Sequence, residues 1–381
     1  MKNFTRFATA LTALGMVATY ATNAQDLTAK TNTEKAVALL NSIETGDSSA
    51  IAYVNPNHYV QHNLSVADGL AGFGEVLQAL PENSAKVNVV RSFQDGNYVV
   101  THTDYNFFGP KIGFDVFRFE DGQIVEHWDN LTEKSDQPNP SGRTQLDGET
   151  TITDHHKTLE NKALVASFVD TVLINGRFDQ LTNFISAETY IQHNTQIGDG
   201  LQSLGDAIQA MAKQGITMEY DKLHKVLGQG NFVLAISDGK FANQHVSYYD
   251  LFRIEDNKIV EHWDVIESIL PEEEWKNSNG KFGFESDYIV EVATFELKPD
   301  VSPEAFAALD KQVETTHVAK QPGFISRESG LTQDNYWRVI VHWQSVEDAE
   351  ASMASFMNAP AAKAFLSDAD TSTMIMRRFA N

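Results

Sequence analysis

The chain has 381 residues, and its 52 acidic side chains against 29 basic ones give a formal net charge of −23. Such an acidic surface repels phosphate backbones and anionic lipid, so nucleic acid and membrane surfaces are excluded as favoured partners. The sequence contains no cysteine, which excludes disulfides, thiolate metal sites and thiol nucleophiles. Its length is enough for two or three domains of ordinary size.

The first 24 residues have the pattern of an export signal. Lys2 and Arg6 precede a largely apolar stretch, residues 7–17, which is too short to span a bilayer, and small residues before Ala24 offer a cleavage site. The alternative is a buried N-terminal helix. We expect a signal peptide over residues 1–24, a periplasmic or secreted protein, and no membrane insertion after cleavage.

Two segments of the chain occur twice. Residues 115–129 and 250–264 are identical at 11 of 15 positions, and Tyr-x-Gln-His-Asn occurs at 59–63 and at 190–194. The same domain is therefore present in two copies, which we place at residues 28–135 and 157–270.

Each copy begins with helical periodicity and continues with strands. The expected helices cover about 36–43 and 72–80 in the first copy, and about 164–173 and 204–213 in the second. The expected strands are 86–93, 97–106, 112–119 and 123–131, then 216–227, 231–238, 246–254 and 258–266. This order predicts an α+β fold in which a curved antiparallel sheet wraps helices and leaves a pocket.

A third unit follows the repeats. Turn-rich linkers are expected at residues 136–156 and 271–285, and a C-terminal domain at 286–381. Its pattern predicts strand 288–297, helix 303–318, strands 324–330 and 335–343, helix 346–357 and strand 371–379. That is the ferredoxin-like order.

The repeated hairpin brings ionisable groups onto one face of the sheet. Residues of one parity are Asp115, Phe117, Phe119, Val125, His127 and Asp129 in the first copy, and Asp250, Phe252, Ile254, Val260, His262 and Asp264 in the second. A carboxylate among apolar side chains must be paired or protonated, and burial makes it a usable acid or base. The alternative is an Asp–His pair that only pins the sheet. Arg118, Glu126 and Trp128 lie on the opposite face, where we expect a cross-strand ion pair and an aromatic cover.

A second polar group precedes Asp-Gly in each copy. His62 and His193 are candidate proton carriers at the pocket mouth, although a turn with a packed histidine is the structural alternative. The candidate substrate-binding residues around them are Tyr59, Gln61, Asn63, Tyr190, Gln192 and Asn194. His102 is a further candidate that the second copy replaces with Ile236. Spacing offers no zinc motif, and we expect no metal.

At these motifs the repeats resemble the SnoaL-like polyketide cyclases of the nuclear-transport-factor-two-like superfamily. The resemblance covers roughly 30–135 and 157–270. It implies cone-shaped α+β barrels with a deep pocket and frequent homodimers. Members of the family include cofactor-free acid/base enzymes, and many others are binding or uncharacterised proteins. Matched to the family's acid/base positions, the pairs are Asp115 with Asp129 and Asp250 with Asp264.

The C-terminal unit resembles antibiotic-biosynthesis-monooxygenase-type domains, which are dimeric α/β barrels of ferredoxin-like fold. The residues that carry the resemblance are Gln321 to Phe324, Tyr336 to Trp343 and Ser345 to Asp348. Trp337 is a candidate substrate contact there, although an aromatic residue on a central strand more often packs in the core or a dimer interface. Further candidates in this unit are Arg338, His342 and His317.

Three functions are consistent with these patterns. The first is an exported acid/base enzyme of aldol, cyclase or isomerase type that uses no cofactor on a small apolar carbonyl or aromatic compound. The second is a periplasmic protein that binds such a ligand without reacting. The third is a cofactor-independent monooxygenase that acts through the C-terminal domain. A homodimer through the repeats or the C-terminal domain is a further expectation.

Overall fold

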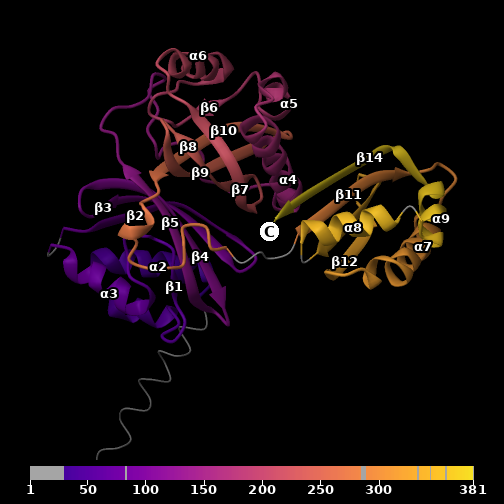
Figure 1. Ribbon diagram of the computed structural model, residues 1–381, viewed down its shortest axis with the longest axis horizontal. Helices are drawn as coiled ribbons and strands as arrows, with labels where there is room; N and C mark the ends of the chain where they lie inside the picture. Colours follow the sequence, from indigo (N-terminus) through magenta and orange to yellow (C-terminus); the bar gives the residue numbers. More distant parts are fainter. Residues whose placement is uncertain are drawn as a thin grey trace, which may run out of the picture.

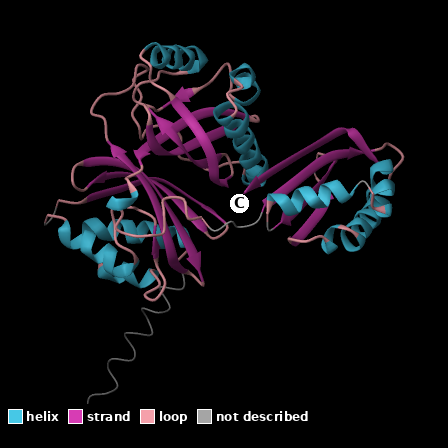
Figure 2. Cartoon of the chain, viewed as in Figure 1, coloured by secondary structure: helices cyan, strands magenta, loops and turns pink. Residues whose placement is uncertain are grey.

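The computed structural model describes residues 30–81, 84–284, 289–332, 334–343, 345–356 and 358–380. It confirms the predicted α+β class, with three separate sheets and their helices (Figures 1 and 2). The predicted signal peptide lies outside the described residues. Within them, no helix combines the length and apolar character needed to cross a membrane.

The first unit (residues 32–133) wraps a curved sheet around its helices. Helices α2 (Asn32–Thr45) and α3 (Gly69–Ala79) precede strands β2 (Lys86–Asp95), β3 (Tyr98–Asn106), β4 (Pro110–Glu120) and β5 (Gln123–Glu133), and a short 3-10 helix, η1 (Ser48–Tyr53), follows α2. A capping box between Thr31 and Glu34 begins α2, and Gly46 at φ 69° ends it. Side chains of α2, η1 and the concave sheet face form one apolar cluster.

The second unit (residues 155–268) repeats this plan with a looser first helix. A short 3-10 turn, η2 (His155–Lys157), leads into α4 (Thr158–Phe168), and α4 continues as a π-helical turn, η3 (Val169–Ile174). The elements that follow are the 3-10 turn η4 (Phe178–Gln180), α5 (Leu181–Phe184) and α6 (Gly200–Lys213). The sheet strands are β7 (Met218–Gln229), β8 (Phe232–Phe241), β9 (Gln244–Glu255) and β10 (Lys258–Ser268). All eight long strands agree with the predicted segments.

Two details of the repeated sheets were not predicted. Short strands β1 (Val60–Gln61) and β6 (Ile191–Gln192) pair in parallel with β5 and β10 and complete the five-stranded sheets. A β-bulge also shifts each hairpin register, so Phe119 pairs with Ile124 and Ile254 with Ile259. The expectation that Val125 and Val260 share the concave face is therefore wrong, because each is the extra residue of a bulge.

The C-terminal unit (residues 289–380) is ferredoxin-like in topology. Its elements are β11 (Ile289–Leu297), α7 (Pro303–Thr316), the 3-10 turn η6 (Val318–Lys320), β12 (Phe324–Leu331), β13 (Tyr336–Trp343), α8 (Val346–Phe356), α9 (Pro360–Asp368) and β14 (Ala369–Ala380). The antiparallel strands are ordered β12-β13-β11-β14. Helix α9 was not predicted, because only three residues separate it from α8.

The two repeated units pack sheet against sheet. The faces turned away from their helices form one apolar cluster that includes Phe114, Val116 and Trp128 from the first sheet and Leu251 and Trp263 from the second. The Asn130 amide crosses this boundary and donates to the carbonyl of Val265 at 2.8 Å. The face at which a separate copy could pair is thus already covered within one chain, and the expected homodimer stays a prediction.

The segments that follow the two sheets each bind the opposite unit. We call residues 134–154 the first tail and residues 269–284 the second tail. The Asn139 side chain of the first tail donates to the carbonyls of Gln192 and Ile197 in the second unit, at 2.7 and 2.8 Å. The Asn277 side chain of the second tail donates to the carbonyls of Asn63 and Val66 in the first unit, at 2.8 and 2.9 Å. The predicted linkers are therefore ordered parts of the paired units.

Replacing Asn277 with alanine should destabilise the protein by about 1–3 kcal/mol, because it leaves two main-chain carbonyls without their donor. Urea unfolding measures this loss as a decrease in the free energy of unfolding. Ser278→Ala, at the adjacent exposed position, is the matched control and should change the stability little. Equal stabilities of the two variants would contradict a binding role for the second tail.

Candidate functional site

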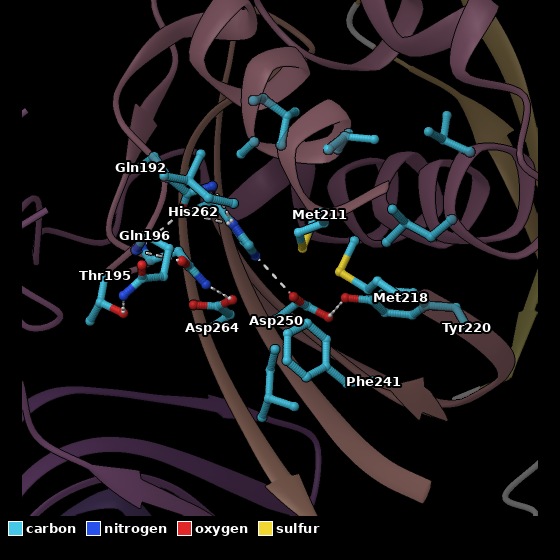
Figure 3. Close-up of a pocket in the computed structure, with 18 of the residues that line it drawn as sticks. Gln192, Thr195, Gln196, Met211, Met218, Tyr220, Phe241, Asp250, His262 and Asp264 are labelled. Atoms are coloured by element: carbon cyan, nitrogen blue, oxygen red, sulfur yellow. Dashed lines mark hydrogen bonds and ion pairs between the residues drawn. The ribbon is translucent and has the colours of Figure 1, made fainter. Parts of the chain in front are cut away.

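A cavity of about 500 Å³ lies between the concave sheet face and the helices of the second unit (Figure 3). Most of its walls are apolar and come from α4, η3, α6 and the sheet, including Phe168, Val172, Met211, Met218, Phe241 and Ile266. Asp250, His262 and Asp264 line one side of it. Strands β9 and β10 hold these three side chains, because Asp250 pairs directly with Asp264 and Phe252 with His262.

Asp250 and His262 form the inner part of this group. Nε2 of His262 lies 2.9 Å from Oδ1 of Asp250, and its Nδ1 lies 3.2 Å from Oε1 of Gln192. The hydroxyl of Tyr220 donates to Oδ2 of Asp250 at 3.1 Å. Burial alone would lower the pKa of His262, but the hydrogen bond and charge of Asp250, with the charge of Asp264, raise it. The geometry thus favours a positively charged imidazole.

Asp264 is the outer carboxylate and is half-buried in the cavity wall. The Asn194 amide donates to its Oδ2 at 2.6 Å. Burial raises the pKa of Asp264, helped by the charge of Asp250 and opposed by that of His262. Tyr190 also lines the cavity; burial and the two nearby carboxylates raise its pKa, so its hydroxyl keeps its proton. A carboxyl with a raised pKa beside a cation and a phenol is equipped for proton transfer.

The first unit holds the same group in a more enclosed form. Asp115, His127 and Asp129 are all buried, with exposures of 4%, 9% and 6%. Nε2 of His127 lies 3.2 Å from Oδ1 of Asp115, and the Tyr105 hydroxyl donates to Oδ2 of Asp115 at 2.7 Å. The Asn63 amide donates to Asp129 at 2.8 Å.

A cation from the second tail marks the difference between the two groups. The Lys281 ammonium lies 3.9 Å from Oδ1 of Asp129 and donates to its main-chain oxygen at 2.8 Å. The corresponding residue of the first tail, Arg143, instead binds Asp199 at 3.1 Å. Lys281 also forms a closer ion pair with Glu267, so its positive charge beside Asp129 is shared with a second carboxylate. Among the ion pairs of the described residues, no tail residue brings a positive charge to Asp264.

The group in the first unit also has the donor types of a divalent-metal site. One ligand atom each from Asp115, His127 and Asp129 lies within 4.8 Å of the others. Lys281 already supplies positive charge beside Asp129, and a divalent ion there would meet its repulsion. Activity without a metal or other cofactor therefore stays our prediction.

The structure separates His62 and His193 from the two carboxylate groups. Nε2 of His62 lies 2.8 Å from Glu126 and its Nδ1 lies 2.6 Å from the Gly280 carbonyl. Nε2 of His193 lies 2.9 Å from Glu261, and its Nδ1 lies 2.8 Å from the Thr144 carbonyl. Each histidine thus uses Nδ1 to bind a tail and Nε2 to bind the glutamate of its own hairpin, so neither lies at the pocket mouth.

His102 likewise faces the other unit. Its register partner is Phe114, on which it stacks, and its Nδ1 lies 3.2 Å from Nη1 of Arg91. Burial, reinforced by the charge of Arg91, holds the pKa of His102 well below its usual range. The neighbouring Thr101, of opposite parity, is the residue that meets Asp115. His102 is thus a neutral contact between the units.

The other candidates fall into two groups. Gln61, Asn63, Gln192 and Asn194 orient the histidines and outer aspartates of the hairpins, and Gln192, Asn194 and Tyr190 line the cavity. Tyr59 is buried in the apolar cluster of the first unit. Trp337 is also a core residue, 3% exposed and edge-on to Phe306 at 5.0 Å. It therefore cannot serve as the proposed substrate contact without repacking of that core.

The tyrosines that bind the inner aspartates were not predicted. Tyr105 lies on β3, whereas Tyr220 lies on β7. The position in the second copy that is equivalent to Tyr105 is Gly239, and Tyr220 is the register partner of this glycine. The two hydroxyls reach equivalent aspartates from adjacent strands. Aligning the two copies misses them, since neither tyrosine aligns with a tyrosine. A search for aromatic residues exchanged between neighbouring strands could have found them.

Comparisons with known proteins give partial structural likenesses. No protein-family model matches the sequence, and no curated protein matches it. Among solved structures, SnoaB from Streptomyces nogalater, a cofactor-independent oxygenase, is 21% identical, with 25% of this chain and 93% of SnoaB covered and a TM-score of 0.22. IdmH from Streptomyces antibioticus, a candidate polyketide cyclase, is 20% identical, with 27% and 92% covered and a TM-score of 0.24. An NTF2-like protein of unknown function from Cytophaga hutchinsonii is 17% identical, with 27% and 90% covered and a TM-score of 0.24.

The raised pKa of His262 gives a pH dependence with a defined sign. Protonated His262 stabilises the fold fully below its unfolded pKa, near 6.5, and this contribution is lost as the pH rises through the higher folded pKa. Asp250→Asn should lower the His262 pKa, because it removes the charge that holds the proton. NMR titration of the imidazole measures the change, and Asp115→Asn is the matched control in the first unit. An unchanged His262 titration in Asp250→Asn would contradict the assignment.

Proposed function

We propose that this protein is a cofactor-free acid/base enzyme that moves a proton next to the carbonyl of a small, largely apolar compound. The reaction class is that of an aldol-type cyclase or an isomerase. The observation that carries the proposal is Asp264, a half-buried carboxyl with a raised pKa, in the wall of an apolar 500 Å³ cavity beside His262. A cavity of this volume suits a small organic ligand.

In the proposed reaction Asp264 is the base. Its carboxylate accepts the proton from the carbon adjacent to the substrate carbonyl, and the C–H electron pair forms the enolate. The Tyr190 hydroxyl is the donor available to the enolate oxygen, while the nearby charge of His262 favours the developing negative charge. Asp264 then returns the proton to another carbon. In the aldol branch the enolate carbon instead attacks a second carbonyl, and the oxygen of that carbonyl takes the proton from Asp264. Asn194 orients the base through its hydrogen bond.

We assign the first unit a supporting role. Its Asp115, His127 and Asp129 repeat the arrangement, but all three are buried and Lys281 lies beside Asp129. His102, which only the first copy has, stacks on Phe114 away from this group and does not add to it. Export to the periplasm or the medium is part of the same proposal, since a signal peptide is predicted at residues 1–24.

Asp264→Asn should slow proton abstraction by about 100-fold or more, the usual contribution of a general base. Exchange of α-hydrogens for deuterium in a panel of small aryl ketones, followed by NMR, measures this step without knowledge of the natural product. Asp129→Asn is the matched control and should retain most of the exchange activity. If both variants and the wild-type protein exchange equally fast, Asp264 is not the base.

Binding without reaction is the second candidate function. It is favoured by the fact that Asp250 and His262 are already satisfied by protein partners and could simply shape an apolar pocket. In that case ketones that raise the melting temperature would be recovered with their α-hydrogens unexchanged. The same deuterium experiment therefore separates the two functions.

A further inference from the structure

A second cavity, of about 690 Å³, lies where the C-terminal sheet meets the second unit. Helices α7, α8 and α9 cover one face of this sheet. On the other face, Val290, Val292 and Ile340 pack against the cluster that contains Ala163 of α4, and Figure 1 shows β14 reaching towards this helix. The cavity is the part of this face that α4 leaves open, with Leu159 and Ala163 as one wall.

Two arginines on neighbouring strands line this cavity. Arg338 of β13 is the register partner of Thr294, and Arg377 of β14 is the partner of Val292, so the arginines flank β11 on the same face. They are separated by about 10 Å across the sheet and about 7 Å along it, from ordinary strand spacings. Side chains of this length can reach one ligand placed over Thr294.

These two guanidinium groups have no protein partner among the residues that the structure describes. Every other arginine in the described ranges donates to a carboxylate or a main-chain carbonyl. Glu160 and Asp334 also line the cavity, yet neither forms an ion pair with Arg338 or Arg377. In a chain with a net charge of −23, two arginines without a carboxylate are an uncommon arrangement.

The rest of the lining defines the chemistry of a ligand. Hydroxyl groups come from Thr294, Thr332 and Tyr336. Ile375 is an apolar member of the same sheet face and is 57% exposed. Guanidinium groups bind carboxylates through paired N–H donors, and the apolar walls suit a hydrocarbon body.

We propose that this cavity is a binding site for an organic carboxylate with an apolar, aromatic-sized body. Arg338 and Arg377 bind the carboxylate, and Ile375, Leu159 and Ala163 contact the body. The site is separate from the cavity of the second unit, whose lining includes Asp250 and Asp264 but no arginine or lysine to bind a carboxylate. The proposal goes beyond the proposed acid/base function and does not depend on it.

Calorimetric titration of the full chain with 2-naphthoate tests this proposal, with 2-naphthamide as the uncharged ligand of the same shape. We expect measurable binding of naphthoate and at least tenfold weaker binding of the amide. The double variant Arg338→Gln, Arg377→Gln should weaken naphthoate binding at least tenfold. Lys311→Gln, which removes one positive charge from the exposed surface of α7, is the control and should leave it unchanged.

The affinities of the wild-type chain for naphthoate and for naphthamide test the proposal even if the double variant does not fold. Equal affinities for the acid and the amide would overturn the proposal, as would no detectable binding of naphthoate. Undiminished binding by a folded double variant would also overturn it. If Asp264→Asn rather than the arginine variant changes the naphthoate affinity, the ligand occupies the second-unit cavity and the proposal fails.

Discussion

The pairing of the repeated units depends on two buried carboxylates, Glu126 and Glu261. Each is almost fully enclosed, at 4% and 1% exposure, and each accepts from an arginine of its own hairpin, Arg118 at 2.5 Å and Arg253 at 2.6 Å. A buried charge that loses its partner costs about 3–5 kcal/mol, so these contacts are needed once the sheets close on each other. The remaining carboxylate oxygen binds the histidine of Tyr-x-Gln-His-Asn. That histidine in turn holds the tail of the other unit.

This arrangement explains why the two copies keep similar residues while their sites differ. The repeated Glu-His-Trp sequence serves two faces at once, because Glu126 and Trp128 lie against the other unit and His127 faces inward. Packing between the units therefore accounts for part of the repeated sequence without any role in the cavities. The surroundings of the two inner groups differ at one tail residue. Lys281 lies beside Asp129, whereas the corresponding Arg143 binds Asp199 and not Asp264.

Local patterns in the sequence predicted most of the fold. The two-residue period located every long strand of the repeats, and the Arg118–Glu126 pair followed from strand parity alone. Predictions failed where the deciding contact came from a distant segment. The strand face of Val125 depended on a bulge, and the role of His62 depended on the Gly280 carbonyl, 218 residues away.

The sequence predicted which residues form the two candidate groups. It did not predict which of the two groups lines a cavity. Asp250, His262 and Asp264 share a face as the alternation requires, yet only the enclosing helices decide how open that face is. The π-helical turn at Val169–Ile174 and the longer α6 shape the cavity in the second unit, and neither is evident from the hairpin motif. Tyr220 entered from a different strand than its counterpart, which no alignment of the copies shows.

The crossing of the tails has a consequence for how the chain can be divided. A cut near residue 154 would leave the first tail on one fragment and the unit it binds on the other, and the second tail would be separated from its own binding surface in the same way. Each fragment would then carry the piece that the other lacks. Such halves are suited to reassemble as complementary fragments, and the gene is a poor candidate for excision of either copy as an independent module.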